Sequence, residues 1–275
     1  MATIAVIVIA QEEEANIRHC LRSVEGWAKQ TFVVDGGSRD RTVAVARDNG
    51  ALVVENAFVD WARQRNWALD HLPIESEWVL FLDADETAPA CLWEEIGRMV
   101  DGLPSSVAAL SIRQQHMFLG RYLRHAHSSP RLIRVVRPDG ARWECVGARE
   151  YAMVDGKVAH LSHLVRHEDH RGLTAWIEKQ NRNATREALA MRTGAKLMTA
   201  RTGPTVRNIR YGLHSRVWNR MPLFVRPILY FLYTYVGRLG FLDGWQGFVF
   251  CFLHSLWYRL LIDAKYREML LQTGK

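Results

Sequence analysis

The first 85 residues alternate continuous apolar runs with segments of helical periodicity, and this alternation constrains the fold more than any other feature. The apolar runs contain few polar interruptions, as in strands that are buried on both faces of a parallel sheet. They cover residues 3–10, 31–35, 51–55 and 77–82, and the helical segments cover residues 12–24, 41–49 and 61–72. Such repeated strand–helix–strand units predict an α/β fold with a doubly wound, mostly parallel mixed sheet.

The later part of the chain has a looser pattern. A helix is expected over residues 89–103, strand-like pieces over 108–112, 132–136 and 151–154, and a long helix over 173–192. We therefore predict a catalytic domain over residues 1–190, with a nucleotide-binding half (1–105) and an acceptor half (106–190). Residues 191–275 are expected to form a helical, aromatic and basic region.

Polar residues follow three of the predicted strands at their carboxyl ends, where a doubly wound sheet binds its ligand. They include Gln11, Asp35 and the pair Asp83 and Asp85. Asp83, Asp85 and the adjacent Glu86 would repel one another unless they shared a cation, and carboxylate oxygens favour Mg²⁺ or Mn²⁺. The alternative is that these acids are solvated or cap the next helix.

The loop after the second strand contains Asp35-Gly-Gly-Ser38 but lacks the Gly-x-Gly-x-x-Gly pattern of dinucleotide-binding folds. Asp35 suits a hydrogen bond to a base or ribose, and an ordinary turn is the alternative. Arg63, Arg65 and Asn66 lie on the helix before the Asp83 strand. An arginine there could bind a diphosphate through both arms of its guanidinium, or could simply lie on the helix surface.

Four segments in order resemble glycosyltransferase family 2, and in particular its bacterial branch of lipopolysaccharide-core and exopolysaccharide β-glycosyltransferases. They are VIVIAQEEE (6–14), VVDGGSRD (33–40), QRNWAL (64–69) and WVLFLDADE (78–86). The resemblance extends over roughly residues 3–190. It implies a GT-A fold and inversion at the anomeric carbon, in which a carboxylate base deprotonates the acceptor hydroxyl and a metal ion neutralises the leaving diphosphate.

The resemblance also implies roles for single residues. Glu150 would be the catalytic base, with Glu144, Glu168 and Asp169 as rivals, because Arg149 stands where the family commonly has histidine. Asp85 and His167 would bind the metal ion. The residues implied in donor binding are Gln11, Glu13, Asp35, Arg65, Asp83 and Ala84.

Four histidines precede the predicted long helix, namely His160, His163, His167 and His170. His163 and His167 have the i, i+4 spacing of a metal pair on a helix. A zinc site would need further ligands and a helix at that point, and the sequence indicates neither. Surface or turn positions are expected for several of these histidines.

The positive charge of the chain lies in its last third. Residues 192–275 contain 13 Lys and Arg and 3 acidic residues, a net charge of +10, whereas the rest of the chain has −3. Two apolar, aromatic runs in this region are shorter than a membrane-spanning helix requires. Their Trp and Tyr content and flanking arginines indicate attachment to an anionic membrane surface, with packing on the core or on a second subunit as the alternative. No nucleic-acid-binding motif is present.

These features predict a membrane-associated glycosyltransferase that uses Mg²⁺ or Mn²⁺, a nucleotide sugar such as a UDP-sugar, and a lipid-linked saccharide acceptor. The alternatives are a sugar nucleotidyltransferase and an inactive lipid-binding scaffold. The four cysteines form no paired motif, and the amino terminus has no basic segment before its apolar run. A peripheral or monotopic location on the cytoplasmic face of the inner membrane is therefore expected.

Overall fold

The computed structural model describes residues 3–129, 131–146, 149–194 and 221–272. The chain divides into two compact units. The first holds residues 1–117, 129–145 and 150–172, and the second holds residues 118–128, 146–149 and 173–275. The long helix that the sequence places in the catalytic domain belongs here to the second unit, and the domain boundary at residue 190 stays a prediction.

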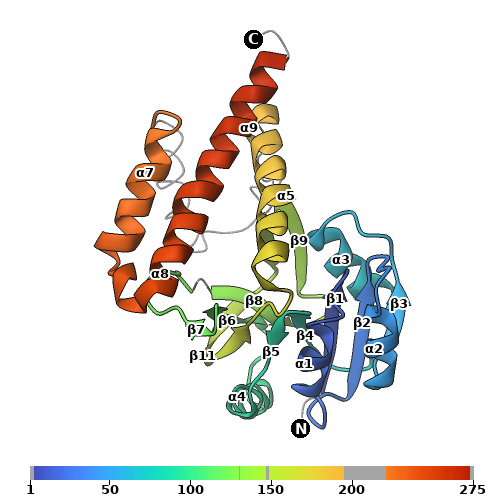
Figure 1. The fold of residues 1–275 in the computed structure, drawn as a ribbon. Helices are drawn as coiled ribbons and strands as arrows, with labels where there is room; N and C mark the ends of the chain where they lie inside the picture. The colour runs from blue at the N-terminus through green and yellow to red at the C-terminus, as the bar shows by residue number, and fades with distance from the viewer. Residues whose placement is uncertain (1–2, 130, 147–148, 195–220, 273–275) are drawn as a thin grey trace. The chain divides into compact units, whose positions relative to one another are not determined.

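The first unit is built on a mixed sheet, which in the described residues has the strand order β3-β2-β1-β4-β8-β6-β11-β5 (Figure 1). Strands β1, β2, β3 and β4 are parallel to one another, whereas β8 runs antiparallel to both β4 and β6. The bounds are β1 Ile4–Ala10, β2 Gln30–Asp35, β3 Leu52–Glu55, β4 Trp78–Asp83, β5 Glu86–Thr87, β6 Val107–Phe118, β7 Arg121–Tyr122, β8 Arg131–Val136 and β11 Lys157–His167. The predicted mixed, mostly parallel sheet is confirmed.

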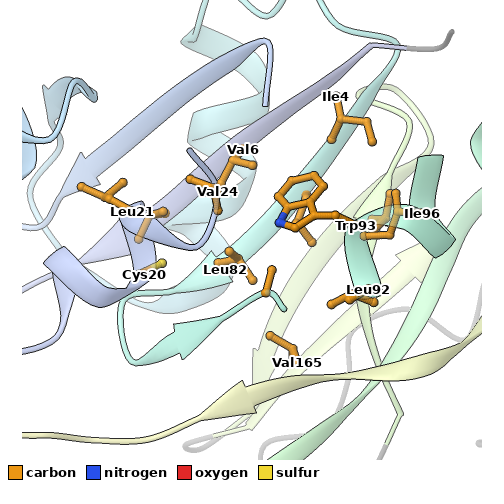
Figure 2. Close-up of a cluster of buried hydrophobic side chains, with 14 of the residues drawn as sticks. Ile4, Val6, Cys20, Leu21, Val24, Leu82, Leu92, Trp93, Ile96 and Val165 are labelled. Carbon is orange, nitrogen blue, oxygen red and sulfur yellow. The ribbon is translucent and has the colours of Figure 1, made fainter. Parts of the chain in front are cut away.

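Helices cover both faces of this sheet, because its central strands are apolar on both sides. In β1, Val6 and Val8 pack into one core and Ile7 and Ile9 into the other. The first core includes residues of α1 (Ile17–Arg22), α2 (Thr42–Asp48) and α4 (Ala90–Val100), and Figure 2 shows Trp93 of α4 within it. The second core includes α3 (Trp61–His71) and Trp143 of β9 (Ala141–Val146). Strand β9 pairs with β10 (Arg149–Val154) in a separate sheet.

The first helix begins later than predicted. The sequence places a helix over residues 12–24 with acids in its first turn, but α1 begins at Ile17. The acids instead bind the loop after β2: the carboxylate of Glu12 accepts from the Arg39 amide and that of Glu14 from the Arg41 amide, each at 2.9 Å. Backbone amides of the neighbouring loop thus give these carboxylates the partners that a helix terminus would otherwise supply.

The histidine-rich segment is a strand, not the start of a helix. Residues 157–167 form β11, which lies between β6 and β5 and pairs parallel with β6. The register is shifted between His160 and Leu164. This irregularity breaks the two-residue alternation by which a half-buried strand is recognised in a sequence, and it explains why β11 was not predicted.

The second unit is helical, as predicted, and has an aromatic cluster. Its helix α5 (Gly172–Thr193) lies beside α9 (Tyr258–Gln272), where the Lys265 ammonium donates to the Thr185 hydroxyl at 2.7 Å (Figure 1). Phe118, Trp176 and Phe250 pack together in its core. The remaining elements are α7 (Val225–Leu232), the π-helix η1 (Tyr233–Gly237), the 3₁₀-helix η2 (Gly240–Asp243), α8 (Gly244–Phe250) and the π-helix η3 (Cys251–Trp257).

Candidate active site

The carboxyl ends of three parallel strands lie level at one edge of the sheet, and the candidate site is built on them. Ala10 at the end of β1 pairs with Asp35 at the end of β2, and Ile9 pairs with Asp83 at the end of β4. In this register alternate side chains of β1 pack into the two cores, and a shift of one residue would exchange them. The structure thus brings together the polar strand ends that the sequence indicates.

The carboxylate of Asp35 organises the loop after β2. It is buried, and its Oδ2 accepts hydrogen bonds from the amides of Gly37 and Ser38, each at 2.9 Å. Its Oδ1 accepts from the Ser38 hydroxyl at 2.5 Å. Three donors on one carboxylate fix its orientation, so Asp35 presents a rigid acceptor at the strand end. Its predicted contact with the nucleobase stays a prediction.

Gln11 lies against the same loop. Its Nε2 donates to the carbonyl oxygen of Gly36 at 3.3 Å. A Cβ at position 36 would lie 2.9 Å from Cβ of Phe58 and 3.2 Å from Cβ of Gln11, so this close packing requires glycine. The structure therefore places Gln11 against the loop after Asp35, and its contact with the nucleoside stays a prediction.

Glu13 is bound to two other parts of the first unit. It is buried, and its carboxylate accepts from Nδ2 of Asn16 at 2.6 Å and pairs with Arg171 at 2.8 Å. Arg171 also pairs with Asp169 at 2.7 Å. Burial alone would raise the pKa of Asp169, but hydrogen bonds from Arg171 and Asn16 lower it. Glu13 thus holds residues 169–171 against the loop after β1, while its predicted place in the nucleoside pocket stays a prediction.

Asp83 is neutralised by two arginines. Arg65 of α3 donates from Nη2 to Oδ1 of Asp83 at 2.6 Å, and Arg134 of β8 donates from Nη2 to Oδ2 at 2.6 Å. Burial opposes ionisation, but the two guanidinium groups lower the pKa of Asp83 from 3.8 to about 2. The cations beside Asp83 in this structure are therefore two arginines, of which Arg134 is shared with Glu86. The predicted contact of Asp83 with the donor sugar would be made beside these two guanidinium groups.

Glu86 shares Arg134 with Asp83. Its side chain is fully buried, and its carboxylate accepts from Nη2 of Arg134 at 2.9 Å and from Nε2 of Gln114 at 2.7 Å. Its Oε2 also accepts from the backbone amide of Asp83 at 3.0 Å. Burial raises the pKa of Glu86 in spite of Arg134. Glu86 therefore anchors the segment of Asp83 and Asp85 from within the core.

Glu150, the predicted base, is joined to the Asp83 segment through Arg65. Nε of Arg65 donates to Oε1 of Glu150 at 2.7 Å, so one guanidinium binds both carboxylates. Arg65 is itself buried and lies over the ring of Phe81, 5.2 Å from its centroid. Nε and Nη2 of this arginine therefore contact carboxylates, where the sequence suggested a diphosphate. Its Nη1 is buried without a hydrogen-bond partner among the described residues.

The rivals of Glu150 differ in their surroundings. Both carboxylate oxygens of Asp169 accept from Arg171, at 2.9 and 2.7 Å, and Asn16 donates to the same group. Glu168 is exposed, and its backbone amide donates to the carbonyl oxygen of Asp85 at 2.9 Å. Glu144 is half-buried on β9. Arg65 thus links Glu150 to Asp83, whereas Arg171 links Asp169 to Glu13.

Asp85 and His167 come together where β5 pairs with β11. Nε2 of His167 lies 3.3 Å from Oδ2 of Asp85, and the His116 ring stacks on the His167 ring at 4.7 Å. The described residues contain no group of three or more metal-binding side chains. Mg²⁺ and Mn²⁺ bound to a diphosphate need only one or two protein ligands, so this pair fits such an ion. The side chain of Ala84 is buried in the core, so its predicted contact with the donor would be made by its backbone atoms.

The other histidines have separate partners. Nδ1 of His163 lies 2.9 Å from the Glu95 carboxylate, and Nδ1 of His160 lies 2.6 Å from the Ser111 hydroxyl. His163 and His167 are on a strand, so the helical spacing considered for a metal pair does not apply. Of the four histidines, only His167 contacts an acid of the Asp83–Asp85 segment in the described residues.

Sequence reasoning missed two arginines of the site. Arg134 carried a signal, because it interrupts an apolar strand and a buried arginine is rarely found without an acidic partner. Arg171 carried none, since its partner Glu13 lies far away in the sequence and a turn residue of this kind is ordinarily exposed.

Comparison with known proteins gives a family match and several partial relatives. The family model of Glycosyl transferase family 2 matches residues 5–158. A TPR repeat-containing protein of Synechococcus elongatus is 32% identical over 116 residues, which are 42% of this chain and 28% of that protein. An uncharacterized glycosyltransferase of Rickettsia bellii is 33% identical over 93 residues, 34% of this chain and 31% of that protein. The chain thus spans about a third of the length of these curated relatives.

Among solved structures, glucosyl-3-phosphoglycerate synthase from Mycobacterium tuberculosis, in complex with Mn²⁺, UDP and glucosyl-3-phosphoglycerate, is 18% identical with a TM-score of 0.45. The match covers 72% of this chain and 82% of that one. TarS of S. aureus is 16% identical with a TM-score of 0.44, covering 67% and 39%.

Proposed function

The chain belongs to glycosyl transferase family 2, and from this premise we propose that it is an inverting, metal-dependent hexosyltransferase whose donor is a UDP-sugar. The observation that carries the proposal is the placement of Asp35 and Asp83 at neighbouring strand ends, with Asp85 in the turn after β4 and His167 beside it. This arrangement provides a rigid acceptor for the nucleoside and, a short distance along the sheet edge, a carboxylate–imidazole pair for a divalent ion.

Each group of the site has a separate task in this proposal. Asp35 and Gln11 bind the nucleoside, and Asp85 and His167 hold Mg²⁺ or Mn²⁺. That ion, when bound, would neutralise charge on the departing diphosphate. Asp83 is fixed by two guanidinium groups and can accept a hydrogen bond from a donor hydroxyl without moving. Such preorganised acceptors need no rearrangement during the reaction.

Glu150 is the base that we propose for the acceptor hydroxyl. Arg65 binds its Oε1, so Oε2 is the oxygen that can take the proton while the acceptor oxygen attacks the anomeric carbon. The Glu150 side chain is 22% exposed, which leaves room for an acceptor to reach it. Attack by the acceptor oxygen on the side opposite the leaving diphosphate gives inversion.

We further propose that the acceptor is a lipid-linked glycan of cell-envelope polysaccharide or lipopolysaccharide synthesis, used at the cytoplasmic face of the inner membrane. The net charge of +10 over residues 192–275 supports this location, because anionic lipids attract such a segment. The resemblance of the four amino-terminal segments to the bacterial envelope branch of the family supports this class of acceptor.

A thermal-shift screen tests the donor and the metal together. UDP should raise the melting temperature with Mn²⁺ or Mg²⁺ but not without them, because the proposed ion would neutralise the diphosphate. A ligand at about 100 times its Kd stabilises the native state by about 2.7 kcal/mol. Asp85→Ala should abolish the metal-dependent shift and the release of UDP from a UDP-sugar. Asp70→Ala, which removes a half-exposed acid from α3, should change neither. Metal-dependent stabilisation that survives in Asp85→Ala would refute the assignment of the ion.

A further inference from the structure

The helical hairpin of the second unit, residues 222–257, exposes two apolar stripes. One stripe lies on α7 and η1 and consists of Val225, Ile228, Leu229, Leu232 and Val236. The other lies on η2, α8 and η3 and consists of Leu242, Trp245, Phe248 and Phe252. Their spacing of three or four residues places each stripe along one face of its helix. Exposed apolar surfaces of this extent mark a site of contact with another apolar phase.

The charged residues of the same hairpin point inward. Between residues 222 and 257 the sequence has three of them, Arg226, Arg238 and Asp243. Arg226 is 4% exposed, and its guanidinium binds the carboxylate of Asp263, which is 1% exposed. Breaking such a buried pair leaves a charge without compensation, so the pair fastens the open end of the hairpin to α9.

The other two charges are bound within the turn of the hairpin. Asp243 is 2% exposed, and its Oδ2 accepts from the backbone amides of His125 and Ala126, each at 2.8 Å. Arg238 donates to the carbonyl oxygen of His127 at 3.2 Å. Hence the charged groups of residues 222–257 are turned toward the protein, while large apolar side chains are turned outward.

Helix α5 of the same unit has the opposite, ordinary pattern. Its exposed positions include the charged residues Glu178, Arg182 and Arg186, and its buried positions include Trp176 and Ala184. Helix α5 therefore does not share the inverted pattern of the hairpin. Charged groups inside and apolar groups outside are the distribution expected of a segment whose surroundings are hydrocarbon.

We propose that this hairpin inserts its two apolar stripes among the acyl chains of one bilayer leaflet. The proposal deepens the membrane location given above, since it replaces attraction at the headgroups with insertion below them, and it does not depend on the proposed chemistry. The occupant of the apolar surface is thus lipid. Exposed Trp245 and Tyr233 suit the boundary between headgroups and hydrocarbon.

The dimensions favour one leaflet. Residues 225–237 of α7 and η1 extend about 20 Å at 1.5 Å per residue, less than the roughly 30 Å of the hydrocarbon core. Of the helices in the described part of the chain, one, from Gly240 to Gln272, could cross a membrane by length and composition alone, and 33% of its most apolar stretch is buried within the chain. Its last turns hold Lys265, Arg267 and Glu268, which insertion of only residues 222–257 leaves in water.

Flotation of the full chain with phosphatidylcholine vesicles, with and without anionic phosphatidylglycerol, tests the proposal. At about 1 M salt, where the Debye length is about 3 Å, a headgroup-bound protein dissociates from anionic vesicles, whereas an inserted hairpin stays bound. Leu232→Glu and Phe248→Glu should each lower the partition coefficient by about tenfold or more, because a carboxylate is costly at this depth. Leu189→Glu is the matched control, since Leu189 of α5 is 44% exposed, close to the 49% of Leu232.

Fluorescence quenching by lipids brominated on their acyl chains measures depth. The wild type should be quenched, and Trp245→Phe should lose much of this quenching while it still floats. Release by salt, equal loss of flotation in Leu189→Glu, or a dimer that covers the stripes and ignores vesicles would each overturn the proposal. Metal-dependent stabilisation by UDP should be unchanged in Leu232→Glu, so a failure of insertion and a failure of the proposed function give different results.

Discussion

Replacement of Arg134 by methionine should destabilise the first unit more than the loss of any surface ion pair. Arg134 is 6% exposed and binds Asp83 at 2.6 Å and Glu86 at 2.9 Å, and Glu86 itself is fully buried. Methionine preserves most of the side-chain volume but leaves Glu86 without its guanidinium partner. Removing one partner of a buried ion pair costs about 3–5 kcal/mol.

This cost should appear in urea unfolding followed by far-ultraviolet circular dichroism, and as a loss of roughly 6–20 °C in melting temperature at about 2–4 °C per kcal/mol. The double variant Arg134→Met, Glu86→Gln should recover part of the loss, because it no longer buries an unpaired acid. Arg142→Met is the control: its pair with Asp70 is 3.0 Å long but half-exposed, and should contribute less than about 1 kcal/mol. A loss in Arg134→Met no larger than in this control would refute the reasoning.

Three further predictions follow from the first unit. The pKa of Asp83 is about 2 in the folded chain against an ordinary 3.8, so its stabilising contribution is complete above about pH 4 and is lost as the pH falls toward 2. In Asp83→Asn the melting temperature should therefore depend less on pH over this range. A pH dependence equal to that of the wild type would contradict this. Gly36→Ala should cost about 1–3 kcal/mol of unfolding free energy and weaken UDP binding, because a Cβ there would approach Phe58 to 2.9 Å. Gly97→Ala, with open space around it in α4, should leave the stability unchanged or raise it. Scanning calorimetry measures the stability and titration calorimetry the UDP binding. Cys91 is exposed and should react quickly with a thiol reagent at pH 8, whereas burial raises the pKa of Cys20 and should delay its reaction until the chain unfolds; a fast phase that persists in Cys91→Ser would contradict this.

The central strands could be predicted because their signal is local. Continuous apolar runs identify β1, β2 and β4, and their common direction places Asp35 and Asp83 at one edge without knowledge of any long-range contact. Alternation and end residues are properties of short windows, and such windows are what a single sequence can be searched for.

The interior of the site could not be predicted in the same way. The link from Glu150 through Arg65 to Asp83 joins three segments that are distant in the sequence, and no local pattern specifies such a partner. The late start of α1 has a similar cause, since Glu12 and Glu14 bind amides of the loop after β2 rather than those of their own helix. Propensity is overridden here by tertiary hydrogen bonds.

The position of β11 between β6 and β5 has a consequence for the order in which the molecule assembles. β11 is the last strand of this sheet in chain order, and it brings His167 to Glu86 by pairing with a strand from the first third of the chain. Such non-local pairing must wait for closure of a long loop, so we expect it to be a late step of folding. A nascent or clipped chain that ends before residue 157 would carry Asp85 without His167. If Asp85 and His167 hold the ion as proposed, sugar transfer would begin only after β11 has paired with β5.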